Sequence, residues 1–137
     1  MGNSSGGGLA LGSLLLLRDG GSTPLPSASV LISPWVDLRM TAPSYRRFAG
    51  YGHGRARGSG SPAVSRHHAT RHPGSIFGRS VDMTEHESLL HFRDLYLQGR
   101  PLDTINCPLQ ADLRRLPPTL VLAGEVELFI DDIRGAA

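Results

Sequence analysis

The sequence predicts an α/β fold in which helices flank a parallel β-sheet. Two short apolar runs that contain β-branched residues, 28–32 and 119–123, have the length and composition of parallel strands covered on both faces. Segments with helical character lie near 6–18 and 84–98, so strands and helices alternate along the chain. Alternation of this kind is typical of a parallel sheet with helical crossovers.

The first helix is expected over residues 6–18. It begins in a triple glycine and ends near Asp19-Gly20-Gly21, where glycine favours termination. Its leucines, at 9, 11 and 14–17, occupy more than one face, as in a helix packed against a sheet. The strand over 28–32 then ends at Ser33-Pro34.

The second helix is expected to begin at Thr84, because Thr84 and Glu87 have the spacing of a capping box. It continues to about Gln98, with Gly99 at its end and one apolar stripe formed by Leu89, Phe92 and Tyr96. A short last helix is expected over 128–135, after the strand at 119–123.

We assign the whole chain, residues 1–137, to one domain. The segment 49–80 within it differs in composition from the rest. It is rich in Gly, Ser, Arg and His without helical or strand periodicity, and we expect a disordered insert or loop. Residues 46–79 hold seven of the 14 arginines and no acidic residue, so the alternative function is non-catalytic binding of nucleic acid or another polyanion. Sparse aromatic residues and the lack of a recognised binding motif disfavour that alternative.

Composition also limits the location and the cofactors. No apolar stretch approaches the roughly 18 residues of a membrane span, and no basic leader precedes residues 9–17, so a cytoplasmic protein is expected. The single Cys107 has no clustered partners, which predicts a packed thiol rather than a zinc site. The chain has no lysine and therefore no P-loop, and neither a metal nor an organic cofactor is expected.

The residues Gly2-Asn3-Ser4-Ser5-Gly6 fit the pattern Gly-x-Ser-x-Gly. At a strand-to-helix turn, this spacing holds the serine in a strained conformation while small neighbours let strand and helix approach. The hydroxyl of Ser4 would then stand exposed, and the backbone N–H of Ser5 would face a developing oxyanion. Taken alone, the pentapeptide is a weak signal in a Gly- and Ser-rich chain, where the alternative is a flexible tail.

Two further blocks give the motif a context. Val30-Leu-Ile-Ser-Pro-Trp-Val-Asp-Leu38 follows it, and Leu116-Pro-Pro-Thr-Leu-Val-Leu-Ala-Gly-Glu-Val-Glu-Leu-Phe-Ile-Asp-Asp132 comes later. In this order the three blocks resemble the hormone-sensitive-lipase-like branch of the α/β-hydrolases, over about residues 1–48 and 83–135. The resemblance implies a partial α/β-hydrolase fold and a serine carboxylesterase or lipase-like hydrolase of small-molecule esters.

The resemblance also implies roles for particular residues. Ser4 takes the position of the nucleophile, the Ser5 N–H that of an oxyanion donor, and Glu127 that of the acid of a catalytic triad. The family more often has Asp at this last position; a glutamate can also accept from an imidazole and stabilise the imidazolium. Glu125 is the competing candidate for the acid, and either carboxylate could instead be solvated at a strand end.

Parts of the family's machinery are missing from the sequence. The triad order on this fold is Ser, acid, His, yet all six histidines precede Glu127. The family's glycine-rich oxyanion loop and the strand that leads to the nucleophile would both lie before Ser4 and are expected to be absent. We therefore expect an internal piece of a hydrolase, silent or nearly so in catalysis; acyl preference and oligomeric state do not follow from the sequence.

Overall fold

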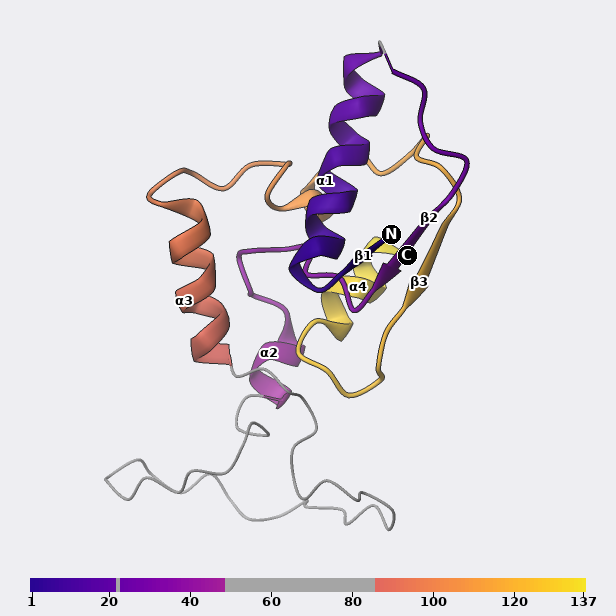
Figure 1. Ribbon diagram of the computed structural model, residues 1–137. Helices are drawn as coiled ribbons and strands as arrows, with labels where there is room; N and C mark the ends of the chain where they lie inside the picture. Colours follow the sequence, from indigo (N-terminus) through magenta and orange to yellow (C-terminus); the bar gives the residue numbers. More distant parts are fainter. Residues whose placement is uncertain (22, 49–85) are drawn as a thin grey trace, which may run out of the picture.

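The computed structural model describes residues 1–21, 23–48 and 86–137 (Figure 1). The basic segment 49–80 and the capping residue Thr84 lie outside these residues. The elements in chain order are β1 (Gly2–Asn3), α1 (Ser5–Gly20), β2 (Ser29–Ile32), α2 (Pro43–Phe48), α3 (His86–Leu97), the 3-10 helix η1 (Pro108–Gln110), β3 (Thr119–Leu122) and α4 (Ile130–Ala136).

The three strands form a parallel sheet in the order β1-β2-β3. Leu31 in β2 is paired with Gly2 on one side and with Val121 on the other. The expected α/β fold with a parallel sheet is thus confirmed, and both predicted strands lie within one residue of their expected bounds. The expectation that the strand before Ser4 is absent is wrong for two of its residues, because Gly2–Asn3 pairs with β2.

The described helices lie on one side of the sheet, to the left of β2 and β3 in Figure 1. On that side, Leu31 packs with Leu11 of α1, and Val121 packs against a core that includes Phe129. Side chains at alternate positions point to the other face. There Leu120 and Leu122 are 56% and 47% exposed, so the expectation that β3 is covered on both faces is wrong for the described residues.

Helix α1 keeps only part of the predicted burial. Leu11, Leu14 and Leu15 are buried, whereas Leu9 and Leu16 are exposed. The helix ends as the glycines predict: Gly21 adopts the left-handed conformation with φ 64° and donates its N–H to the Leu17 carbonyl at 3.3 Å.

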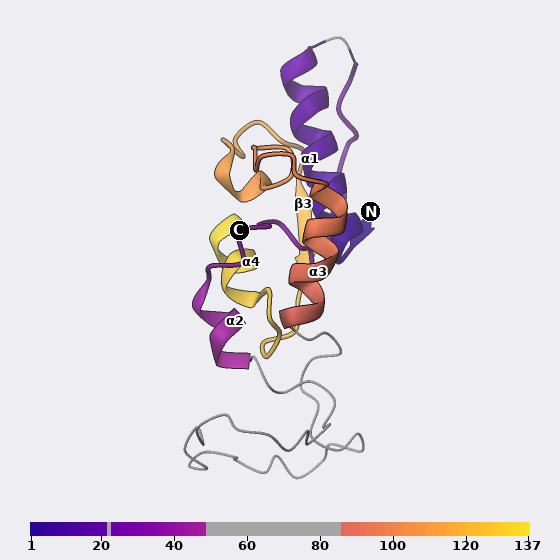
Figure 2. The same cartoon turned by 90° about the vertical axis from the view of Figure 1, so that its left-hand side faces the viewer.

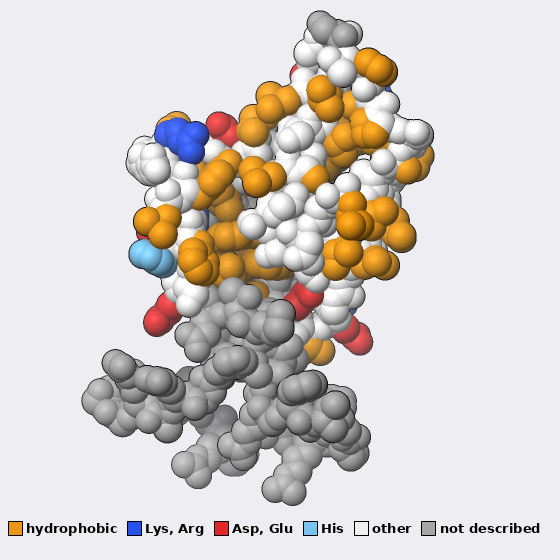
Figure 3. Space-filling view, viewed as in Figure 1, with side chains coloured by type: hydrophobic (Ala, Val, Ile, Leu, Met, Phe, Trp, Pro, Cys, Tyr) orange, Lys and Arg blue, Asp and Glu red, His pale blue; other side chains and the backbone are white. Residues whose placement is uncertain are grey.

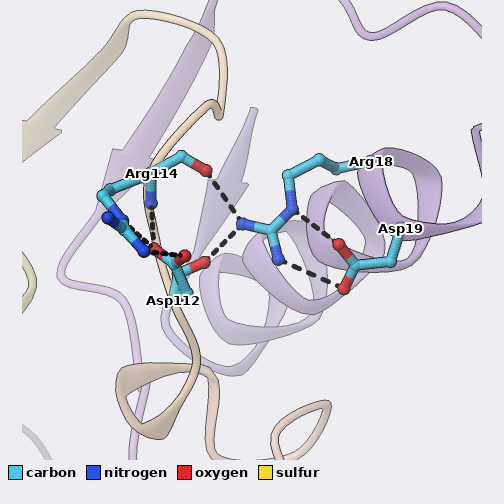
Figure 4. A network of polar contacts seen from close by, with 4 residues as sticks. All are labelled: Arg18, Asp19, Asp112 and Arg114. Carbon is cyan, nitrogen blue, oxygen red and sulfur yellow. Dashed lines mark hydrogen bonds and ion pairs between the residues drawn. The ribbon is translucent and has the colours of Figure 1, made fainter.

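Arg18, near the end of α1, fastens the helix to the chain that precedes β3 (Figure 4). Its guanidinium donates to the carbonyl oxygens of Asp112 and of Arg114, and it also pairs with Asp19. The side chains of Asp112 and Arg114 pair with each other at 2.8 Å. The helix is therefore fixed at this end by main-chain acceptors and not only by exposed ion pairs, which alone stabilise little.

The close contact between α1 and the segment after β2 requires glycine. A Cβ at Gly7 would lie 2.6 Å from the Cβ of Pro34, and one at Gly8 would overlap the carbonyl oxygen of Trp35. A Cβ at Gly6 would meet no atom within 4 Å. The prediction that both glycines of Gly-x-Ser-x-Gly must be small is confirmed at Gly2, where a Cβ would overlap the Gly6 carbonyl oxygen, and is wrong at Gly6.

A buried polar cluster joins α2 to the start of α4. The hydroxyl of Ser44 donates to the carbonyl oxygen of Leu128 at 2.6 Å, and the hydroxyl of Tyr45 donates to Oδ2 of Asp132 at 2.9 Å. Burial raises the pKa of Asp132 to about 6, although the Tyr45 hydrogen bond opposes the shift. Burial and the nearby Asp132 also raise the pKa of Tyr45, so that its hydroxyl stays protonated and donates.

Cys107 is buried, at 1% exposure, and burial raises the pKa of its thiol, so the prediction of a packed thiol is confirmed. Within the described part of the chain, no helix combines the length and the apolar character that crossing a membrane requires.

We predict that Gly8→Ala lowers the free energy of unfolding by about 1–3 kcal/mol or more, because the added methyl overlaps the Trp35 carbonyl. Gly6→Ala should be neutral or raise that free energy by up to about 1 kcal/mol, since alanine is the better helix former and has room. Urea unfolding followed by circular dichroism compares the two variants, and equal losses of stability would contradict the packing described here.

We also predict that Asp132→Asn removes a pH-dependent part of the stability. A carboxyl group whose pKa is higher in the folded than in the unfolded chain adds stability as the pH falls through about 6 towards 4. Relative to the Asn variant, the wild-type chain should therefore gain up to about 3 kcal/mol between pH 7 and pH 4. Unfolding midpoints of both proteins across this range measure the difference; a difference that does not change with pH would refute the assignment.

Candidate active site

The candidate site lies where the three strands end. The Ser4 N–H, one residue beyond β1, donates to the carbonyl oxygen of Ile32 at 3.0 Å, and the Ser33 N–H, one residue beyond β2, donates to Leu122 at 2.7 Å. Ser4 and Ser33 both have positive φ, 51° and 42°, which is uncommon for residues other than glycine. After β1 and after β2, the chain thus makes one more ladder bond and then turns sharply. Both serines therefore lie at the edge of the sheet where the strands have their carboxyl ends.

Ser4 lies at the turn from β1 into α1, where the sequence predicts it. Its carbonyl oxygen accepts from the N–H groups of Gly7, Gly8 and Trp35 at 2.9, 3.2 and 2.9 Å. A φ of 51° with a ψ of −123° is a strained combination, of the kind that concentrates at functional sites. The hydrogen bonds on both sides of the peptide unit hold the strain in place.

Ser5 is the first residue of α1 and is exposed. Backbone N–H groups in the first turn of a helix lack intrahelical acceptors and carry the positive end of the helix dipole. The N–H of Ser5 is therefore suited to face a negative charge that develops beside Ser4.

Glu127 lies in the turn between β3 and α4 and is partly buried. Its Oε2 accepts from the hydroxyl of Ser33 at 2.8 Å and from the N–H of Gly124 at 3.1 Å. Its Oε1 is buried and has no hydrogen-bond partner among the described residues. The two oxygens of one carboxylate thus have different surroundings, and only Oε1 remains available to another donor.

The two candidates for the acid have different surroundings. Glu125 is exposed in the turn after β3, whereas Glu127 is held at the end of β2 by Ser33. Ser4 binds Ile32, the residue before Ser33, so the nucleophile candidate and Glu127 are both attached to the carboxyl end of β2.

A cleft of about 500 Å³ opens beside Ser4. It runs between the first turns of α1 and helix α3, which stand next to each other in Figures 1 and 2. Hydrophobic side chains gather along this hollow in Figure 3. Among the described residues, its lining comprises Ser4, Ser5, Gly8, Leu9, Trp35, Leu38, Leu89, Phe92, Arg93, Tyr96, Ile105 and Asn106.

The predicted stripe on α3 is thereby divided. Leu89 is buried in the core, whereas Phe92 and Tyr96 are 56% and 42% exposed and face the cleft or solvent. The described part of α3 begins at His86 and ends at Leu97. Gly99 has a φ of 77°, which agrees with the prediction that this glycine ends the helix.

Trp35 connects the nucleophile turn with the segment that carries Glu127. Its backbone N–H donates to the carbonyl oxygen of Ser4, and its indole ring stacks on the ring of Phe129, with centroids 5.8 Å apart. The segment after Trp35 is fixed by Asp37, which accepts from the backbone and side chain of Arg39. Burial opposes the charge on Asp37, yet these donors hold its pKa below the usual range.

The sequence does not indicate Ser33 as a member of the site. Its position at a strand end before Pro34 predicts neither the positive φ nor the hydrogen bond from its hydroxyl to Glu127. The two histidines among the described residues, His86 and His91, both lie on α3; His86 packs against the ring of Tyr45 and His91 is exposed. In residues 1–21, 23–48 and 86–137, His, Cys, Asp and Glu side chains form no group of three or more that could hold a metal ion.

Comparison with known proteins agrees with this arrangement. Residues 1–58 match a family model of the α/β-hydrolase fold. An acetyl-hydrolase of Streptomyces hygroscopicus is 34% identical over 134 residues, which is 97% of this chain and 35% of the relative.

Solved structures show the same similarity in three dimensions. The crystal structure of an esterase from the bacterial hormone-sensitive lipase family has a TM-score of 0.68 at 32% identity, over 98% of this chain and 35% of its own. A hormone-sensitive lipase from a metagenome library has a TM-score of 0.73 at 26% identity, over 99% of this chain and 37% of its own. This chain therefore spans about a third of the length of these proteins. The described residues thus form a partial α/β-hydrolase fold, and the chain is similar in sequence and structure to esterases of the hormone-sensitive lipase family.

Proposed function

We propose that this chain carries the nucleophile and the acid of a serine carboxylesterase. The observation that supports this most strongly is the strained turn at Ser4, which is held by hydrogen bonds at the mouth of an apolar cleft. The similarity to an acetyl-hydrolase and to esterases supports ester hydrolysis as the reaction class.

In the proposed reaction, Oγ of Ser4 attacks the carbonyl carbon of the ester while a general base takes its proton. The carbonyl oxygen becomes an oxyanion, which the N–H of Ser5 stabilises. The carbon–oxygen bond to the alcohol breaks, the alcohol leaves with that proton, and an acyl-serine remains. Water then attacks the acyl-serine, which releases the acid and restores the Ser4 hydroxyl.

Glu127 would act in this reaction through an imidazole. Its role is to accept an N–H from the imidazole and to stabilise the imidazolium that forms when the proton is taken. The buried, unpartnered Oε1 is suited to that role, because a buried carboxylate oxygen without a donor is costly to leave unpaired. This is also why we propose Glu127 rather than the exposed Glu125.

The cleft suggests the kind of ester. Its walls are mainly apolar and include Leu9, Leu89 and Phe92, so the proposed substrate is a small-molecule ester whose apolar acyl or alcohol part lies against α3. Arg93 and Asn106 provide polar groups in the same lining.

We predict that the purified 137-residue chain hydrolyses p-nitrophenyl butyrate at no more than a few times the rate of buffer. The reason is that the described site has no imidazole on Glu127, and a triad without its base retains only a small residue of catalysis. Release of p-nitrophenol measures the rate. Rapid turnover that Ser4→Ala abolishes would show that the chain supplies its own base.

We further predict that added imidazole allows Ser4 to react with an alkyl fluorophosphonate. Oγ of Ser4 would form a bond to phosphorus, fluoride would leave, and imidazole would take the proton. Mass spectrometry of the intact chain and of its peptides identifies the modified residue.

Ser4→Ala should abolish this labelling, whereas Ser13→Ala, on the exposed side of α1, should leave it unchanged. Absence of labelling in the wild-type chain with imidazole, or equal labelling of several serines, would contradict the proposed function.

A further inference from the structure

The carboxylate of Glu127 is held asymmetrically. Both of its donors, the hydroxyl of Ser33 and the N–H of Gly124, bind Oε2. The other oxygen, Oε1, is buried and unpaired. The side chain is therefore fixed by one oxygen and presents the other.

Gly124 limits how else the carboxylate could lie. A Cβ at this position would come within 3.3 Å of Oε2 of Glu127, so the carboxylate packs directly against the glycine backbone. The Gly124 N–H also donates to Oε2, at 3.1 Å. The Ser33 hydroxyl is the side-chain donor that holds Oε2 in this position and so leaves Oε1 unpaired.

The backbone of Ser33 explains why its hydroxyl reaches Glu127. The Ser33 N–H is bound to Leu122 at the end of β3, and a φ of 42° turns the chain away immediately afterwards. A non-glycine residue in this region carries a backbone cost that glycine does not. The observed serine combines the strained turn with a donor to the carboxylate.

We propose that Ser33 is a positioning residue for Glu127, which binds Oε2 so that Oε1 stays available to accept the N–H of an imidazole. This inference rests on the proposed function of Glu127. Ser33 itself touches neither the substrate nor the reacting atoms in this account; it acts through the carboxylate.

The first test is a double-mutant cycle in the full chain, with Ser33→Ala, Glu127→Ala and both together. If the hydroxyl binds the carboxylate, the two substitutions should be coupled, so that the unfolding equilibrium constant of the double variant departs about five-fold or more from the product of the single effects. Additive effects would overturn the inference, because the hydrogen bond would then contribute nothing.

The second test is the imidazole-dependent labelling of Ser4 by a fluorophosphonate. Ser33→Ala should raise the imidazole concentration at half-maximal rate by about three- to ten-fold, since the carboxylate no longer presents Oε1 in one orientation. Ser33→Gly distinguishes the effect of the missing hydroxyl from an effect of backbone strain. This variant also lacks the hydroxyl, but glycine adopts a positive φ without cost. Both variants should show the same change, and Ser13→Ala should show none.

The outcomes distinguish the two proposals. A wild-type chain in which Ser4 is not labelled overturns the proposed function and, with it, a catalytic effect of Ser33. Labelling that depends on Ser4 but needs the same imidazole concentration in the wild type and in Ser33→Ala overturns the positioning role alone. Recovery of the wild-type value in Ser33→Gly would also overturn that role, because it would assign the effect to backbone strain.

Discussion

The structure depends on two backbone hydrogen bonds that continue the parallel ladder beyond its strands. Ser4 binds Ile32 and Ser33 binds Leu122, so the ends of β1, β2 and β3 are tied to one another at a single edge. Without the first bond, the turn into α1 would be free to relax to an ordinary φ, and without the second, Ser33 would not face the turn after β3. The positions of the candidate nucleophile Ser4, of Ser33 and of the candidate acid Glu127 all follow from this short stretch of ladder.

The rest of the fold keeps these turns rigid. Glycines let α1 lie against the segment after β2, and Trp35 joins the carbonyl of Ser4 to the ring of Phe129. Behind Glu127, the hydroxyl of Ser44 holds the carbonyl of Leu128, and Tyr45 holds Asp132 in α4. The Ser44, Tyr45 and Asp132 side chains are buried, where an unsatisfied polar group is costly, so the turn that carries Glu127 is fixed from two sides. Preorganisation of this kind is what a catalytic constellation requires.

The sequence was sufficient to predict the parallel sheet, the helix after Ser4 and its glycine stop, because periodicity, β-branched runs and glycine act locally. It could not predict that Leu120 and Leu122 are exposed, since an apolar run indicates a buried strand without saying what covers each face. Nor did it predict helix α2. It also did not predict the contact between Ser33 and Glu127, because these two residues are 94 positions apart in the chain. Of the candidate site, local motif chemistry indicated Ser4 and Ser5, whereas the choice of Glu127 needed family register and gains support from contacts between distant residues.

Amide hydrogen exchange at Ser4 and Ser33, followed by NMR on the intact chain, tests the central claim most directly. If both N–H groups complete the ladder, they should exchange as slowly as the paired amides of β2, because they open only when the sheet opens. Exchange at the rate of an unstructured peptide at either serine, while β2 remains protected, would show that the turn is not held and would contradict the account of the site.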